Sequence, residues 1–200
     1  MENSNVVKIG QPITKVGLVN NTPVVDVEEV ILETVKLPDD SPARMKVLHS
    51  EGRKWYLTVV HHEGSEQPFA LFCHTNSHEK TAQTSNAVDV MLTLARNKGI
   101  PSEFVDGTIK KMSHDSNVTK LTRVISLLLR HGVLIKNIVG ELDKMEDVFV
   151  GSFLFQLKKF LSNYIRDGEK AEGRCGDCGG QLVFSEGCYK CLDCGGSKCG

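Results

Sequence analysis

Six of the seven cysteines lie in the last twenty-six residues, and their spacing is typical of metal ligands. The sequence CGDCGG at 175–180 is repeated as CLDCGG at 191–196. A Cys-x-x-Cys turn brings two sulfurs to one side of a metal ion, and two such turns joined by a short strand-forming segment are typical of a zinc ribbon. The pattern therefore predicts a tetrahedral Zn²⁺ site with the ligands Cys175, Cys178, Cys191 and Cys194.

A second set of four cysteines also has ligand spacing. Replacing Cys194 by Cys188 gives the set Cys175, Cys178, Cys188 and Cys191, and it leaves Cys194 and Cys199 outside the site. The D-C-G-G ending that both Cys-x-x-Cys turns share favours the first set. The sequence leaves both allocations open.

Under the first allocation, Cys188 and Cys199 are not metal ligands. If residues 191–196 form the loop of an antiparallel hairpin, the facing pairs are Lys190 with Ser197, Tyr189 with Lys198, and Cys188 with Cys199. Directly opposed residues on one face lie close enough for a disulfide, and neighbouring lysines favour the reactive thiolate. We therefore expect a redox-active pair. The simpler alternative is a structural ribbon whose two remaining thiols have no role.

Composition limits the class of protein. Two hundred residues are enough for one domain and a small appended module. The formal net charge of −1 argues against a general nucleic-acid binder, so nucleic acid is not an expected partner. No apolar run approaches the length of a membrane span, and the start MENSNVVKIG does not resemble a secretory signal. Cysteines at zinc spacing without such a signal predict a cytoplasmic protein.

Residue patterns predict an α+β fold in which a small antiparallel sheet packs with a helical bundle. The segment 45–75 is expected to form a hairpin, because WYLTVV at 55–60 and PFALFCH at 68–74 have strong strand propensity. Apolar residues at helical spacing predict helices. The expected helices span residues 84–98, 117–131 and 150–166.

The central region contains an internal repeat. Residues 90–112 resemble residues 124–145, and each copy predicts a helix, a glycine turn at Gly99 or Gly132, and a shorter helix that ends in Lys-Met. We expect two helical hairpins whose packed faces cover each other.

These patterns divide the chain into four parts. The segment 167–174 is charged, contains glycine and is expected to be a flexible linker. Whether Thr22 to Leu37 pairs as a strand or remains an arm is left open. The expected parts are an N-terminal arm or strand at 1–36, an α+β body at 37–166, the linker at 167–174 and the zinc ribbon at 175–200.

Other polar clusters give no catalytic arrangement. Four histidines lie around the predicted hairpin together with Cys73, but neighbours along a strand point to opposite faces, so we interpret these histidines as surface and edge residues. They are His61, His62, His74 and His78. No phosphate-binding glycine loop or dinucleotide-binding motif is present. An independent active site is therefore not expected.

Several segments resemble the C-terminal part of adenosylcobalamin-dependent (class II) ribonucleotide reductases. They are RKWYLTVVHHEGSEQPFALF, LTRVISLLLRHG and IVGELDKMEDVFVGSFLFQLKKFLSNYI, and the ending CGDCGGQLVFSEGCYKCLDCGGSKCG resembles the cysteine-rich zinc tail of these enzymes. The resemblance covers residues 37–200. The body is similar to the TSCPD-type domain of the family, although the five-residue motif that names this domain is absent.

The resemblance implies an accessory subunit of a split reductase that is not active alone and that takes part in DNA precursor synthesis. The large barrel, the nucleotide sites and adenosylcobalamin would belong to a separate catalytic subunit. Cys188 and Cys199 would carry reducing equivalents from a thioredoxin- or glutaredoxin-like reductant to the active-site disulfide of that subunit. The alternative is a zinc-ribbon module that binds protein or nucleic acid and has no redox role.

Overall fold

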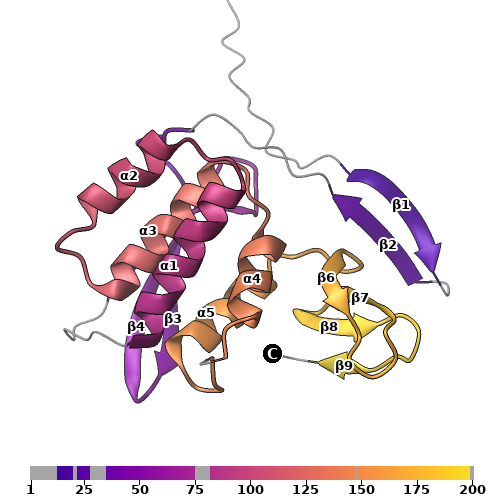
Figure 1. Cartoon of the computed structure of the whole chain (residues 1–200). Coiled ribbons are helices and arrows are strands. Elements are labelled where there is room, and N and C mark those ends of the chain that lie inside the picture. The colour runs from indigo at the N-terminus through magenta and orange to yellow at the C-terminus, as the bar shows by residue number, and fades with distance from the viewer. Residues whose placement is uncertain (1–12, 20–21, 28–34, 75–81, 147, 199–200) are drawn as a thin grey trace, which may run out of the picture.

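The computed structural model describes residues 13–19, 22–27, 35–74, 82–146 and 148–198. The fold class is α+β, as predicted: the described residues form three separate antiparallel sheets and five helices. Figure 1 shows the helices gathered over one sheet to form the body, with the cysteine-rich sheet on the other side of the molecule.

The sheet of the body consists of β3 (Ala43–Ser50), β4 (Arg53–His61) and β5 (Pro68–His74), in that order. The predicted hairpin is confirmed as β4 and β5, whereas β3 was not identified as a strand. Trp55, Leu57 and Val59 alternate along β4 and are each at most 1% exposed in the core that the helices share. The opposite face carries the exposed apolar side chains of Met45 and Phe72, which both lie opposite Thr58.

Two helical hairpins confirm the internal repeat. The first joins α1 (Ala82–Asn97) to α2 (Ser102–Lys111), and the second joins α3 (Asn117–Arg130) to α4 (Ile135–Asp143). The turns contain Gly99 and Gly132, whose φ angles of 75° and 80° lie in the left-handed region that glycine adopts without strain. Helix α1 packs against α3, as the repeat predicted.

Helix α3 also covers the edge strand of the sheet. The backbone N–H of Leu71 in β5 donates to the hydroxyl oxygen of Ser126 at 2.8 Å, and the same hydroxyl lies 2.8 Å from the Leu71 carbonyl oxygen. An unpaired strand edge exposes backbone groups that can pair with another chain. Ser126 therefore satisfies part of this edge from within the fold.

Helix α5 (Phe153–Ser162) is shorter than the segment 150–166 that the sequence predicted. It begins after Ser152, whose hydroxyl accepts a hydrogen bond from the Phe155 N–H at 3.2 Å and caps the helix. The ring of Phe153 contacts Trp55 with 4.7 Å between ring centroids. This contact ties α5 to the sheet.

The segment 167–174 is not a flexible linker, in contrast to the prediction. Residues Lys170–Arg174 form β6, the first strand of a sheet that continues with β7 (Gln181–Ser185), β8 (Cys188–Cys191) and β9 (Ser197–Lys198). Just before β6, Gly168 donates to the Phe184 carbonyl at 2.8 Å, and Phe184 donates to the Glu169 carbonyl at 2.9 Å. These backbone bonds make the segment part of the ribbon.

In the N-terminal region, β1 (Ile13–Val19) and β2 (Thr22–Val27) form an antiparallel pair. The strand alternative therefore holds for these residues, and the pair lies beside the ribbon (Figure 1). Val24 is 4% exposed and packs in a small apolar cluster with Val183 and Leu192. The hairpin thus covers a face of the ribbon.

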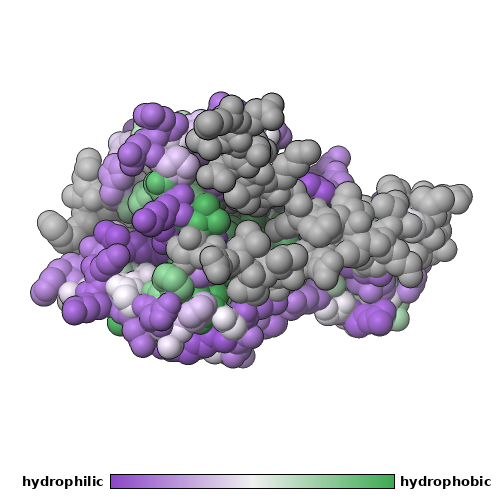
Figure 2. All heavy atoms as spheres, turned by 90° about the horizontal axis from the view of Figure 1, so that it is seen from above, coloured by the Kyte–Doolittle hydropathy of each residue, from purple (hydrophilic) through white to green (hydrophobic). Residues whose placement is uncertain are grey.

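The described surface in Figure 2 is mainly hydrophilic, with hydrophobic side chains in small areas of the face shown. None of the helices in the described ranges has the length and apolar character that a membrane span requires.

Candidate metal centre

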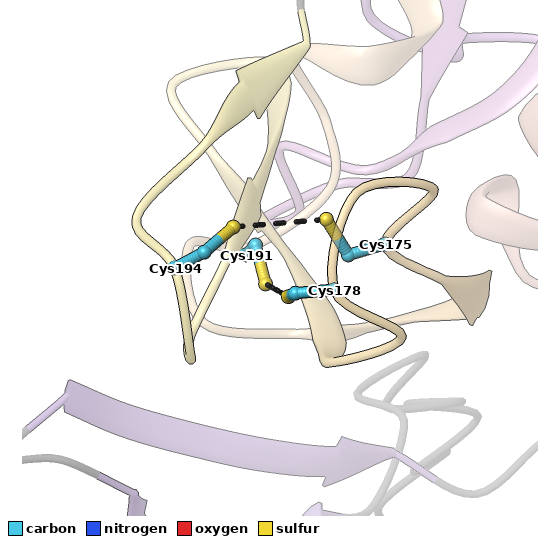
Figure 3. Close-up of side chains that lie close together, drawn as sticks. All are labelled: Cys175, Cys178, Cys191 and Cys194. Atoms are coloured by element: carbon cyan, nitrogen blue, oxygen red, sulfur yellow. Dashed lines mark hydrogen bonds between the residues drawn. The ribbon is translucent and has the colours of Figure 1, made fainter.

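The structure brings together the four cysteines that the sequence selected as ligands. Their sulfurs all lie within 4.8 Å of one another, and Figure 3 shows the four side chains converging from the two Cys-x-x-Cys turns. The Cys175 and Cys194 sulfurs are 3.7 Å apart, and those of Cys178 and Cys191 are 3.4 Å apart. With metal–sulfur bonds of about 2.3 Å, the edge of a tetrahedron is about 3.8 Å, so these separations suit four thiolates around one ion.

Each turn is built by the same backbone bonds. Cys175 N–H donates to the Gly180 carbonyl at 2.9 Å and Gly179 N–H donates to the Cys175 carbonyl at 2.8 Å. In the second turn, Cys191 donates to Gly196 at 2.8 Å and Gly195 donates to Cys191 at 3.1 Å.

The glycines of the two turns are required by geometry. Gly179 and Gly195 have φ angles of 74° and 72°, which favour glycine. A Cβ atom at Gly180 would collide with the Asp193 side chain. The repeated C-G-G ending therefore follows from the shape of the turn.

The four thiols differ in burial and in electrostatics. Cys191 is 1% exposed, whereas Cys178 and Cys194 are exposed. Backbone N–H groups of Cys194 and then Asp193 donate to the Cys191 sulfur and lower its pKa to about 7. The Gly180 N–H lowers the pKa of Cys178, but the neighbouring Cys191 and Cys194 sulfurs outweigh it and raise that pKa to about 12. Cys191 therefore ionises more readily than Cys178.

A polar network fixes the ribbon to the body. The Tyr189 hydroxyl of β8 donates to one carboxylate oxygen of Asp143, at the end of α4, and Lys158 of α5 donates to the other at 2.6 Å. Burial, followed by the hydrogen bond with Asp143, raises the pKa of Tyr189. A second ion pair joins Lys136 of α4 to Glu169 at 3.2 Å, and both side chains are largely buried.

Apolar contacts accompany this network. Phe184 is 2% exposed and Ala171 is 7% exposed, and both belong to the same core cluster as the body helices. The ring of Phe184 lies 4.7 Å from that of Tyr189, measured between centroids. The ribbon therefore shares its core with the body and is not a separately tethered module.

A cleft of about 810 Å³ remains between the body and the ribbon. One wall contains Val150 and Phe155 of the body, and the other contains Arg174 and the first cysteine turn. Val150 is 81% exposed. The cleft therefore offers both apolar and charged contacts next to the cysteine cluster.

Strands β8 and β9 have the register that the sequence predicted, with Tyr189 opposite Lys198 and Lys190 opposite Ser197. Cys188 is disulfide-bonded, whereas the other described cysteines are free. Cys199 lies outside the described residues. Cys188 is also absent from the sulfur cluster, so the structure assembles the first of the two allocations and not the second.

The histidines near the hairpin do not form a second cluster. The cysteine quartet is the only group of candidate metal ligands found within the described ranges. His61 was expected at the surface, but it is 7% exposed and packs near Tyr164, with 6.1 Å between ring centroids. His74 is exposed and stacks on Tyr56, and His78 lies outside the described residues.

Sequence patterns did not identify Asp143 and Tyr189 as partners. They lie 46 positions apart, and neither belongs to a recognisable motif, so no local signal connects them. Comparisons of the chain with protein-family models, with curated proteins and with solved structures found no match.

Proposed function

We propose that the ribbon binds one Zn²⁺ ion through Cys175, Cys178, Cys191 and Cys194. Four sulfur donors in a compact cluster suit zinc or iron, and the zinc-ribbon spacing favours zinc. The ion would hold the two turns together and stabilise the sheet around them. Metal analysis of the purified chain should find one zinc per chain, and a coloured protein with one iron would contradict the proposal.

Metal affinity is expected to fall as the pH falls. The ion binds thiolates, but the pKa of about 12 means that Cys178 carries a proton at neutral pH, and the pKa of about 7 means that Cys191 is only partly ionised there. Binding of the metal ion therefore releases protons from the thiols, so a lower pH weakens metal binding. We expect the dissociation constant to rise at least about tenfold for each pH unit from 8 to 6. Competition with a chromophoric chelator measures the dissociation constant at each pH. A constant metal affinity between pH 8 and pH 6 would contradict this prediction.

We further propose that the chain is the accessory subunit of a split class II ribonucleotide reductase, and that Cys188 and Cys199 form its redox pair. The observation that carries this proposal is the disulfide-bonded state of Cys188 next to a cluster of free thiols. The β8–β9 register supports Cys199 as its partner, because the next facing position after Tyr189 and Lys198 joins residues 188 and 199.

The proposed exchange is balanced in electrons and protons. In the reduced pair, one thiolate attacks the active-site disulfide of the catalytic subunit and forms a mixed disulfide. The second thiol then resolves it, so the catalytic subunit gains two electrons and two protons and Cys188–Cys199 becomes a disulfide. A thioredoxin- or glutaredoxin-like dithiol returns the pair to its reduced state. Adenosylcobalamin would be held by the catalytic subunit.

The fixed position of the ribbon restricts how reducing equivalents can reach the catalytic subunit. Because β6 and Phe184 anchor the ribbon to the body, the whole ribbon does not move on a long linker. We therefore propose that the catalytic subunit docks beside the ribbon, so that its disulfide approaches the end of β8.

The redox proposal predicts that the zinc-loaded chain accepts electrons from thioredoxin. After mild oxidation, the wild-type chain should consume about one NADPH per chain with thioredoxin and its reductase, because a disulfide takes two electrons. Cys188→Ser should consume almost none. Cys73→Ala is the matched control, since Cys73 is a free buried thiol in the body. Equal consumption by Cys188→Ser and the wild type would refute the redox role.

Assignment to a reductase needs a second test. A class II catalytic subunit that lacks its own cysteine-rich tail should turn over repeatedly only when this chain and a thioredoxin system are present. Cys188→Ser or Cys199→Ser should abolish repeated turnover and leave a single turnover. If the wild-type chain neither binds such a subunit nor supports its turnover, the reductase assignment fails even if the disulfide is redox-active.

A second candidate function is a binding module without a redox role. The cleft of about 810 Å³ beside the ribbon favours it, because its charged and apolar walls could receive a protein segment. This candidate predicts that Cys188→Ser binds its partner as tightly as the wild-type chain does. A gel shift at moderate salt tests the nucleic-acid version.

A further inference from the structure

A groove of about 210 Å³ lies at the edge of the body sheet, next to β5 and between α2 and α3. It shares no lining residue with the cleft beside the ribbon. Its walls combine the cations Lys111, Arg123 and Arg130 with the hydroxyl-bearing Thr108 and the aromatic ring of Phe72. No acidic side chain is among the described residues that line it. This composition points to an anionic ligand.

The charges of the groove are only partly compensated. Arg123 forms an ion pair with Asp115 at 2.7 Å, which neutralises one of the three cations. Among the described residues, Lys111 and Arg130 have no ion pair. The groove therefore retains about two positive charges, and an ionised ligand of similar negative charge would balance them.

Arg130 is positioned to bind such a ligand. Its guanidinium group is half-buried, and burial lowers its pKa, which indicates that the cation has lost part of its water. The Nε–H donates to the carbonyl of Ser126 at 3.3 Å, and this contact orients the side chain along α3. A guanidinium has further N–H donors, and within the described residues they have no hydrogen-bond partner. These donors form a planar fork suited to oxygen anions.

We propose that this groove binds a small molecule that carries a phosphate group. A phosphate monoester has a charge close to −2 and three acceptor oxygens, which match the charge of Lys111 and Arg130 and the fork of Arg130. A carboxylate has half that charge and fewer acceptors. The ring of Phe72 is 42% exposed at the side of the groove, where it can contact the organic part of the ligand. The site is independent of the metal centre and of the proposed redox pair.

Calorimetric titration of the full-length, zinc-loaded chain at low salt tests the proposal. The probes are inorganic phosphate, adenosine monophosphate, adenosine and acetate. Phosphate and the nucleotide should bind, whereas adenosine and acetate should bind at least about tenfold more weakly. If the nucleotide binds more tightly than phosphate does, the ligand is a phosphorylated organic molecule. If the nucleotide and phosphate bind with equal affinity, the ligand is free phosphate. Absence of binding by both at millimolar concentration, or acetate binding equal to phosphate, would overturn the proposal.

Two variants with matched controls locate the site. Arg130→Gln should weaken phosphate binding at least about tenfold, whereas Arg96→Gln, at an exposed arginine outside the groove, should not change it. Lys111→Gln should weaken binding, and Lys110→Gln, its exposed neighbour, should have little effect. Both lysines are exposed, so these variants are expected to fold even if Arg130→Gln does not. Equal affinities of Lys111→Gln and Lys110→Gln would place the ligand elsewhere and refute the assignment.

Discussion

Replacing Cys191 by Ser is expected to release the metal and to disorder the ribbon. Cys191 is the most buried of the four clustered cysteines, at 1% exposed, and two backbone N–H groups stabilise its thiolate. A serine hydroxyl is a poor zinc ligand because it stays protonated. Structural zinc contributes about 10–16 kcal/mol in zinc-finger peptides, so loss of one ligand should weaken binding by on the order of a thousandfold.

The same substitution should affect the two parts of the molecule differently. Strands β7 and β8 depend on the metal-bound turns, so their backbone amides should exchange with solvent much faster in Cys191→Ser. The core that the ribbon shares with the body consists mostly of side chains from the helices and the body sheet, so the helices should keep most of their circular dichroism signal. Metal content after dialysis and hydrogen exchange measure these effects. Cys73→Ser is the control for metal content, because Cys73 lies in the body core. One retained zinc and unchanged exchange in Cys191→Ser would contradict the assignment of the ligands.

The two cysteine turns could be predicted from the sequence because their chemistry is local. A Cys-x-x-Cys turn and the glycines that follow it fix both the sulfur positions and the backbone path within six residues. The left-handed φ angles of Gly179 and Gly195 show why the second turn repeats the first. The helices of the body were predictable for a similar reason, since the spacing of apolar residues depends on neighbours along the same helix.

The packing of the ribbon on the body could not be predicted in this way. The segment 167–174 has few apolar residues and was interpreted as a linker, yet Glu169 and Ala171 are buried by contacts with distant elements. Strand β3 was missed because its sequence ARMKVLHS alternates weakly and includes basic residues that face solvent. Composition within a short window carries no information about such tertiary partners.

The network around Asp143 leads to the second large prediction. Asp143→Asn preserves the shape of the side chain but removes the charge that Lys158 and Tyr189 contact. The Lys158 side chain is 10% exposed, so its ammonium group would remain mostly buried without a counter-charge. Breaking a buried pair from one side is costly, and we expect a loss of about 2–4 kcal/mol in the free energy of unfolding. Urea unfolding of the zinc-loaded chain measures it.

Glu141→Gln provides a matched control on the same helix. Glu141 pairs with Lys144 at 2.7 Å, but the Lys144 side chain is 61% exposed, so loss of this pair should cost less than about 1 kcal/mol. Equal losses for Asp143→Asn and Glu141→Gln would show that the network does not anchor the ribbon.

A double variant separates the cost of the buried Lys158 charge from the cost of the weakened Tyr189 contact. Adding Lys158→Met to Asp143→Asn removes the uncompensated ammonium group and should recover part of the stability. In that double variant the Tyr189 hydroxyl faces a neutral amide in place of the carboxylate. Because an amide oxygen is a weaker acceptor than a carboxylate, amide exchange in β8 should stay faster than in the wild type even when the overall stability returns.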